Sequence, residues 1–153
     1  MKIFKIFALV AMMFGMVACN NEKTPEPVID LDTATAYNGT VSVVVAGQEI
    51  PTSNSVVEIV PSADGKSFNI VFKMIRFVPQ MPALDITIPT IGYVIEDEVI
   101  SFAAEGVIPI CMGGEFPQYI VTGLKGTITA TSIDLSLKFG EYQTSFKGSV
   151  VKE

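Results

Sequence analysis

The sequence predicts an all-β domain that forms an antiparallel up-and-down barrel of about eight strands. Apolar and polar residues alternate with period two along most of the chain beyond residue 36, which is typical of strands buried on one face. This region shows no convincing helical period. The turns between the runs are short, so neighbouring strands pair antiparallel, and a meander of this length avoids open edges by closing into a barrel. A two-sheet β-sandwich is the alternative.

The alternation divides into successive strands that are separated by turn residues. In the first strand Val41, Val43 and Val45 share one face. Asp64-Gly65 is a strong hairpin signal between the second strand and the third, and the acidic segment 96–98 provides the turn between the fourth and the fifth. The expected strands are 37–46, 55–60, 66–77, 84–95, 98–109, 118–130, 132–139 and 142–151.

Three of these strands define the expected interior most clearly, because large apolar residues occupy most of the alternate positions. In the third strand the inward face carries Phe68, Ile70, Phe72 and Met74. In the seventh strand it carries Ile133, Leu135, Leu137 and Phe139, with Asp134, Ser136 and Lys138 outside. In the eighth strand it carries Tyr142, Thr144, Phe146 and Val150.

The N-terminal segment has the pattern of a bacterial lipoprotein signal. Lys2 and Lys5 precede an uncharged run at 6–18, which is too short to cross a bilayer as a helix but suits a signal peptide. The run ends in Ala18-Cys19, which resembles the lipobox, where the cysteine receives diacylglycerol and becomes the first residue. Polar, proline-containing sequence follows, as in an extended tether. We expect a signal peptide at 1–18, a lipidated Cys19 with its tether at 19–35, and a barrel domain at 36–153; an ordinary secretory signal and a retained membrane anchor are the alternatives.

Composition and charge narrow the function. The chain has no His, which removes the commonest general base and metal ligand. Its formal charge is −6, and loss of the signal would remove Lys2 and Lys5 but no acid, which leaves about −8. Such an acidic chain is a poor candidate for binding nucleic acid. We expect an outer-membrane lipoprotein of the bacterial cell envelope, on its periplasmic or surface face, with no nucleic-acid partner.

Candidate catalytic residues are few. Cys111 is a nucleophile candidate, but no His exists to activate it, so we interpret it as a small apolar residue at a strand end. Gly113-Gly114 lacks the lysine and helix of a phosphate-binding loop and is interpreted as a turn. No spacing pairs any of the acids Glu58, Asp85, Glu105 and Glu115. The prediction is a protein that is not an enzyme and that has neither a metal site nor a cofactor.

Some motifs resemble a known family. Tyr37-Asn38-Gly39-Thr40 opens the first strand, and the segments 126–139 and 142–150 form the closing pair. Over roughly 36–151 this pattern resembles the calycin-like β-barrel lipoproteins of Bacteroides-type bacteria. The resemblance implies an eight-stranded barrel on a lipid tether, and it implies no catalytic residues. The Gly-x-Trp signature of true lipocalins is absent, because the chain has no Trp.

Two functions remain open at this point. The first is a binding module for a small apolar ligand held inside the barrel. Its candidate ligand-binding residues, which would serve equally well as a solid core, are Phe68, Phe72, Met74, Phe102, Phe139 and Phe146. The second is a structural or interaction module in an envelope assembly, without a small ligand. Its contact would be the segment 71–95, which has large apolar residues on both strand faces, and the link 77–84 would either plug one barrel end or add to the contact.

Overall fold

The computed structural model describes residues 33–76 and 82–151. The predicted signal peptide, Cys19, most of the tether and most of the link 77–84 lie outside the described residues. Within the described chain one antiparallel sheet contains ten strands. They are β1 Thr35–Val45, β2 Gln48–Pro61, β3 Ser67–Ile75, β4 Leu84–Glu96, β5 Val99–Ala104, β6 Ile110–Cys111, β7 Gly114–Glu115, β8 Val121–Ile128, β9 Ser132–Phe139 and β10 Tyr142–Val150.

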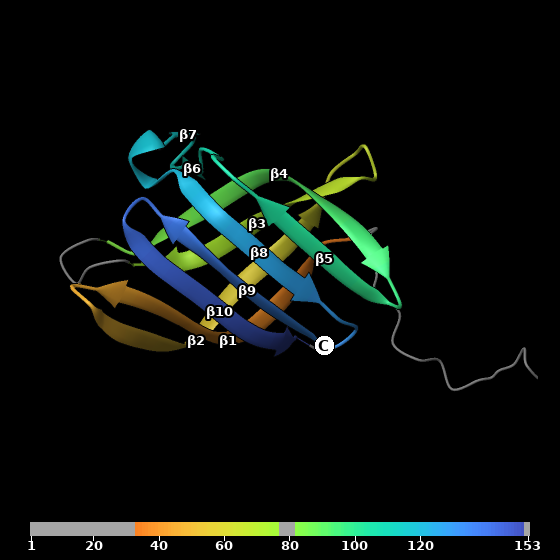
Figure 1. Cartoon of the computed structure of the whole chain (residues 1–153), viewed down its shortest axis with the longest axis horizontal. Helices are drawn as coiled ribbons and strands as arrows, with labels where there is room; N and C mark the ends of the chain where they lie inside the picture. The colour runs from red at the N-terminus through yellow and green to blue at the C-terminus, as the bar shows by residue number, and fades with distance from the viewer. Residues whose placement is uncertain (1–32, 77–81, 152–153) are drawn as a thin grey trace, which may run out of the picture.

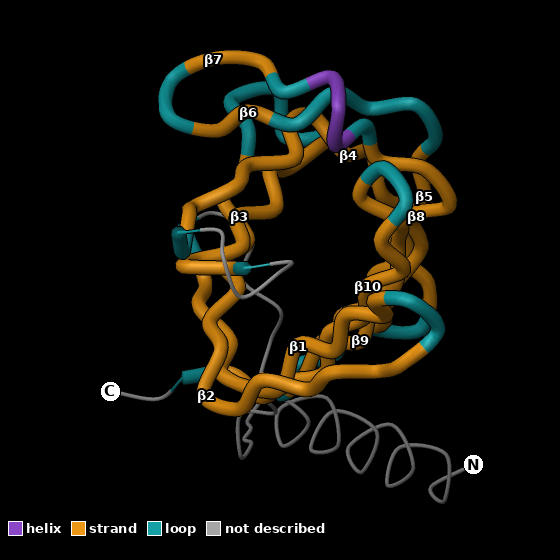
Figure 2. Tube along the Cα trace, turned by 90° about the vertical axis from the view of Figure 1, so that its left-hand side faces the viewer, coloured by secondary structure: helices purple, strands orange, loops and turns teal. Residues whose placement is uncertain are grey.

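Eight of the ten strands close into the predicted up-and-down barrel (Figure 2). Each strand pairs with the next along the chain, from β1 through β5 and from β8 through β10, with β5 joined to β8. The ring closes where β10 pairs with β1, from Tyr37 opposite Val150 to Val43 opposite Thr144. The prediction of an all-β barrel is therefore confirmed, and the β-sandwich alternative does not apply.

The two barrel ends differ in their connections. One end, here the turn end, carries the tight β2–β3, β4–β5 and β8–β9 turns and the start of β1. The other, the loop end, carries the β1–β2 and β9–β10 turns and the segment 105–120, and it lies to the left in Figure 1. Because β1 begins at the turn end, the preceding chain enters the barrel there.

The segment 105–120 differs from the two long strands expected at 98–109 and 118–130. β5 ends at Ala104, and the short hairpin β6–β7 then adds to the edge of β4, where Cys111 pairs with Ile86. A single 3-10 turn, η1 Pro117–Tyr119, leads into β8. Its Tyr119 ring lies 5.7 Å from Phe116 and 6.5 Å from Tyr142, so aromatic side chains gather at the loop end.

Bulges shift the inward phase of several strands, and two of them lie in β3 and β4. In β3 the register is irregular between Phe72 and Ile75, and Met74 has a positive φ of 55°. One extra residue in a strand moves every later side chain to the other face. Ile75 is therefore buried, whereas Met74 is 67% exposed. The prediction that Met74 faces the interior is wrong for this reason, and Thr90, with φ of 58°, produces the same shift in β4.

The strand β2 is much longer than the expected 55–60. Its first half, 48–54, pairs with β1 alone and is exposed on both faces. Pro51 lies in the middle of this half and has no backbone N–H to offer to another strand. The proline therefore limits the pairing of another strand with this half of β2.

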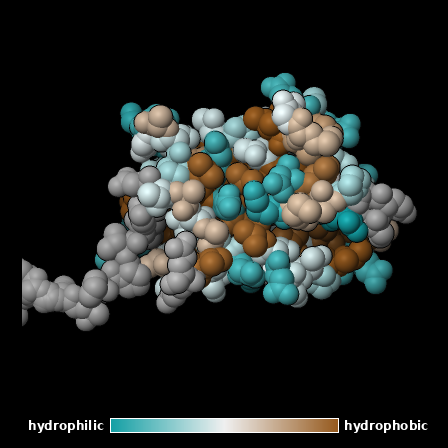
Figure 3. Space-filling model, turned by 180° about the vertical axis from the view of Figure 1, so that it is seen from behind, coloured by the Kyte–Doolittle hydropathy of each residue, from teal (hydrophilic) through white to brown (hydrophobic). Residues whose placement is uncertain are grey.

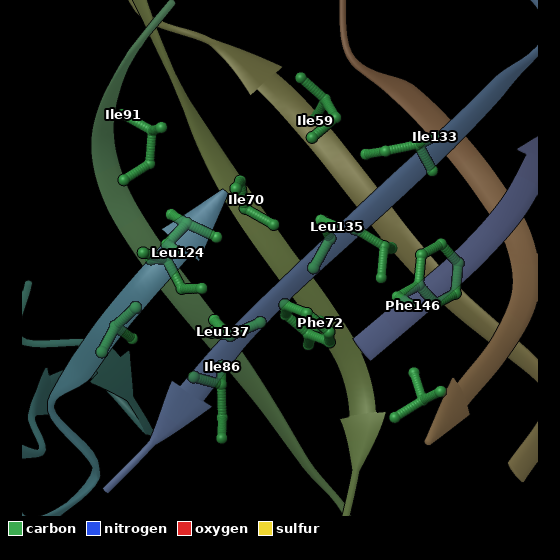
Figure 4. Close-up of a cluster of buried hydrophobic side chains, with 14 of the residues drawn as sticks. Ile59, Ile70, Phe72, Ile86, Ile91, Leu124, Ile133, Leu135, Leu137 and Phe146 are labelled. Atoms are coloured by element: carbon green, nitrogen blue, oxygen red, sulfur yellow. The ribbon is translucent and has the colours of Figure 1, made fainter. Parts of the chain in front are cut away.

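The interior is filled by side chains from all eight barrel strands. The labelled residues in Figure 4 point from the front strands β8–β10 and the back strands β2–β4 into the space between them. The largest fully buried side chains are Phe68, Phe72, Phe139, Phe146, Ile59, Ile70, Ile86, Ile88, Ile91, Ile100, Leu124 and Ile128. Burial of this apolar surface is the dominant stabilising term for a chain whose described residues contain no disulfide.

Candidate functional site

Five of the six predicted ligand-binding residues do converge inside the barrel. Phe72 of β3 lies at the centre of one group, with ring centroids 5.4 Å from Phe139 and 6.4 Å from Phe146. Both contacts are edge-to-face, with interplanar angles of 82° and 76°, a favoured arrangement of aromatic rings. These three rings fill the half of the barrel toward the loop end by contacting one another.

A second aromatic group fills the half toward the turn end. Phe68 stacks on Tyr93 at 5.2 Å and meets Phe102 edge-on at 5.4 Å. The Tyr93 hydroxyl donates to the carbonyl oxygen of Gly65, 3.1 Å away, which ties β4 to the β2–β3 turn. Tyr93 was not predicted as a site residue, although its alternation with Ile91 on the same face could have identified it.

The few buried polar groups of the described interior are satisfied within the protein. Thr144 is fully buried, and its hydroxyl donates to the Tyr142 carbonyl oxygen at 3.1 Å. Ser67 is nearly buried, and its hydroxyl lies 3.2 Å from both carboxylate oxygens of Asp64. Neither group needs a ligand to complete its hydrogen bonds, so the interior has the character of a packed core.

The exposed apolar side chains lie mostly at the loop end. We define the loop-end apolar set as Ile50, Met74, Ile110, Met112 and Ile120. Met74 and Met112 are the most exposed, at 67% and 74%, and they lie on β3 and on the β6–β7 turn, either side of β4. Seen from behind, the barrel surface shows hydrophobic areas interspersed with hydrophilic ones (Figure 3).

The predicted contact segment 71–95 contributes only part of this exposed surface. Met74 belongs to the loop-end set, and Val94 and Ile95 are exposed at the opposite, turn end. Among the other large apolar residues of the segment that the structure describes, Phe72, Ile75, Ile86, Ile88 and Ile91 are buried in the core. The bulges at Met74 and Thr90 therefore explain most of the apolar residues that strict alternation places on both faces of this segment. After each bulge, the alternate set of positions along the strand faces the core.

The outer surface of β8, β9 and β10 is polar and carries three lysines. We call this surface the lysine wall: Lys125 on β8, Lys138 on β9 and Lys147 on β10, with Asp134 as its one acid. It faces the viewer in Figure 1. Lys147 Nζ lies 3.7 Å from Asp134 Oδ2, and both side chains are mostly exposed, so this pair contributes little stability. Sequence reasoning placed Lys138 outside but did not connect it with the other two lysines.

Cys111 is buried, with 2% of its surface exposed, and is not poised for reaction. Burial, and secondarily the Asp85 carboxylate, raise the pKa of its thiol above the usual value. Met112 and Gly113 both have positive φ and form the β6–β7 turn, as a turn was expected there. The cysteine therefore has the environment of a core residue and not that of a nucleophile.

Of the four candidate acids, Asp85 and Glu58 both interact with Lys73, and both raise its pKa. Asp85 Oδ2 lies 3.1 Å from Lys73 Nζ, and Asp85 Oδ1 accepts the backbone N–H of Met74 at 2.9 Å. The N–H group is the main cause that lowers the pKa of Asp85. Glu105 accepts the backbone N–H of Gly123 at the β8 bulge. In the described part of the chain, no three His, Cys, Asp or Glu side chains group as metal ligands would.

Comparisons with known proteins add no relative. No family model matches the chain, and neither the curated proteins nor the solved structures include a significant match. None of the helices in the described segments has the length and apolar character needed to span a membrane. The assignment of the fold therefore rests on the strand register, and the family resemblance stays a prediction.

Proposed function

We propose that the protein is a lipid-anchored lipoprotein of the bacterial cell envelope whose barrel is an interaction module. The observation that carries this proposal is the mutual contact of the aromatic side chains inside the barrel. The aromatic side chains that would bind a small apolar ligand instead contact one another, with Phe72 at the centre of one group and Phe68 at the centre of the other. The outer surface is then what the barrel offers to a partner.

The loop-end apolar set is the contact that this function favours. It projects two exposed methionines, Met74 at a bulge of β3 and Met112 on the β6–β7 turn, and methionine adapts well to a partner's shape. The end also lies opposite the point where the chain enters β1, so it is free to meet a second protein when the N-terminus is held at a membrane. The proposed anchor is the lipid on Cys19, since several acyl chains hold firmly through the hydrophobic effect.

Native mass spectrometry, with lipid extraction, of protein purified from its own cells tests this function. We expect Cys19 to carry the mass of its lipid, the barrel to contain no small molecule, and a stoichiometric complex to be present. Met74→Lys with Met112→Lys should dissociate that complex, whereas Val94→Lys, at the turn end, should not. A small apolar molecule that co-purifies one-to-one would instead support the ligand-binding function, and membrane retention of Cys19→Ser would contradict the anchor.

A further inference from the structure

The charges of the described residues are segregated on the barrel surface. The lysine wall has three cations and one acid, whereas the rest of the described chain has three cations, Lys66, Lys73 and Arg76. The acids outside the wall are Glu49, Glu58, Asp64, Asp85, Glu96, Asp97, Glu98, Glu105, Glu115 and Glu141. One positive wall on an otherwise acidic domain gives the barrel a preferred orientation toward an anionic surface.

The strand register places the lysines on one continuous sheet surface. Lys147 lies opposite Asp134, Lys125 lies opposite Ser136, and Lys138 lies opposite Gln143, each on the outward face. Most of the other outward residues of this surface are hydroxyl or amide side chains. They include Thr122, Thr127, Ser132, Ser145 and Ser149. The neighbouring strands β1 and β5 continue the pattern with Asn38, Thr40, Ser42 and Ser101. Such a surface offers many hydrogen-bond donors beside its cations.

Two hollows on this wall combine a lysine with hydroxyl groups. One, of about 390 Å³, is lined by Lys147 together with Ser132 and Ser149. The other, of about 410 Å³, is lined by Lys125 together with Ser101 and Ser136. Both are open to solvent, and Asp134 lines both of them. A further hollow holds Glu105 beside Lys125. An ammonium group flanked by hydroxyls is a suitable environment for the phosphate of a lipid headgroup, which accepts several hydrogen bonds.

The proposed anchor brings this wall close to lipid. Between Cys19 and β1 lie the 15 residues 20–34, which can span at most about 50 Å. β1 lies beside β10, where the Val151 N–H donates to the Ala36 carbonyl oxygen at 2.9 Å. The tether therefore joins the barrel at the edge of the lysine wall. Because a short tether keeps the lysine wall near the membrane, the wall meets the lipid headgroups at a high effective concentration, and even a weak attraction between them has a large effect.

We propose that the lysine wall docks the barrel onto anionic lipid headgroups of the membrane that holds Cys19. This inference rests on the proposed lipid anchor. Each cation near an anionic membrane changes the equilibrium by about fivefold, so the three lysines, offset by Asp134, favour the docked state by roughly thirtyfold. Docking in this way leaves β2, β3 and β4, on the other side of the barrel, facing away from the membrane.

The test uses the full lipidated chain in vesicles of phosphatidylglycerol and phosphatidylcholine, or of phosphatidylcholine alone. A fluorescent label is attached to Ser136→Cys on the wall or to Thr87→Cys on β4, and its quenching by acrylamide is measured. We expect protection of the Ser136 position on anionic vesicles only, and loss of that protection at high salt. The chain without an added cysteine reports any labelling of Cys111.

Two charge-matched variants decide whether the lysines act specifically. Lys125→Gln, Lys138→Gln and Lys147→Gln together should lower the ratio of docked to undocked protein roughly a hundredfold, because three cations are lost while Asp134 remains. Lys66→Gln, Lys73→Gln and Arg76→Gln together, which remove the same charge elsewhere, should leave it unchanged. Equal quenching at positions 136 and 87 on anionic vesicles overturns the docking proposal. So does protection of position 136 by lipid-free envelope extract, because an acidic protein would then cover the wall.

Failure of the anchor is distinguishable from failure of docking. Mass spectrometry of the purified chain shows whether Cys19 carries lipid before any vesicle is added. If the chain is lipidated but the lysine wall stays accessible to acrylamide, docking is contradicted and the anchor is not. A chain without lipid contradicts the anchor. The quenching experiment on anionic vesicles then measures binding of the lysine wall without help from a tether. Absence of protection in that experiment again contradicts docking.

Discussion

The ring of Phe102 lies directly over Gly126, its partner on the neighbouring strand β8. A Cβ atom on Gly126 would come within 2.5 Å of Phe102 Cζ and within 2.7 Å of the Asp134 carbonyl oxygen. Gly148 also makes room for a ring, that of Phe146 two residues away on the same strand β10, which would lie 2.7 Å from an added Cβ. Inward glycines thus make room for large rings, which is how eight strands hold so many aromatic side chains.

Gly126→Ala should therefore destabilise the barrel by overpacking. We expect a loss of about 1–3 kcal/mol in the free energy of unfolding, because backbone on β9 and the Phe102 ring must both move. Urea unfolding followed by circular dichroism measures it. Gly92→Ala is the matched control, since an added Cβ there meets nothing within 4 Å, and its stability should be unchanged or slightly raised. Equal effects of the two substitutions would contradict the packing explanation.

Phe72 and Met74 form a second matched pair, two residues apart on β3. Phe72→Ala removes the ring that contacts Phe139 and Phe146 and should cost about 3–5 kcal/mol of stability. Met74→Ala removes an exposed side chain and should change stability by less than about 0.5 kcal/mol. Urea unfolding of both variants decides between a packed core and an open cavity, because an open cavity would tolerate loss of the Phe72 ring.

This pair also shows where prediction from sequence succeeds. Alternation placed Phe68, Phe72, Phe139 and Phe146 inside correctly, because period two is a direct consequence of strand geometry. It failed at Met74, because a bulge adds one residue without a sequence signal when the bulged residue is not glycine. The long, two-sided exposed half of β2 was missed because its residues alternate too weakly to be recognised as a strand.

The candidate surface was harder to predict than the core. Lys125, Lys138 and Lys147 are far enough apart in sequence that only the register of β8, β9 and β10 brings them together. Alternation along each strand predicts that the three lysines point outward. It does not predict which residues of the neighbouring strands lie beside them. The short hairpin β6–β7 is also invisible to periodicity, since two residues per strand give no period to detect.

Acid should weaken the barrel partly through Asp85. The Met74 N–H, and secondarily Lys73, lower the pKa of this carboxyl, so its stabilising contribution is present above the ordinary pKa and is lost as pH falls through the folded-state value. Asp85→Asn should therefore lower the urea midpoint at neutral pH and make little difference well below about pH 4. Asp134→Asn, which removes an acid from the wide ion pair with Lys147, should have a smaller effect at neutral pH. A pH-independent difference for Asp85→Asn would contradict this linkage.

Cys111 should react slowly with maleimide in the folded protein. Its side chain is buried against Ile86 on β4, and both burial and Asp85 raise the pKa of the thiol, so little thiolate is present and it is shielded from reagent. Met112→Cys, made together with Cys111→Ala, moves the thiol by one residue to an exposed position, since the native Met112 side chain is 74% exposed. We expect it to react about a hundredfold faster, because Cys111 reacts only through local opening. Mass spectrometry of timed samples measures both rates, and comparable rates would show that the β6–β7 hairpin does not stay packed on β4.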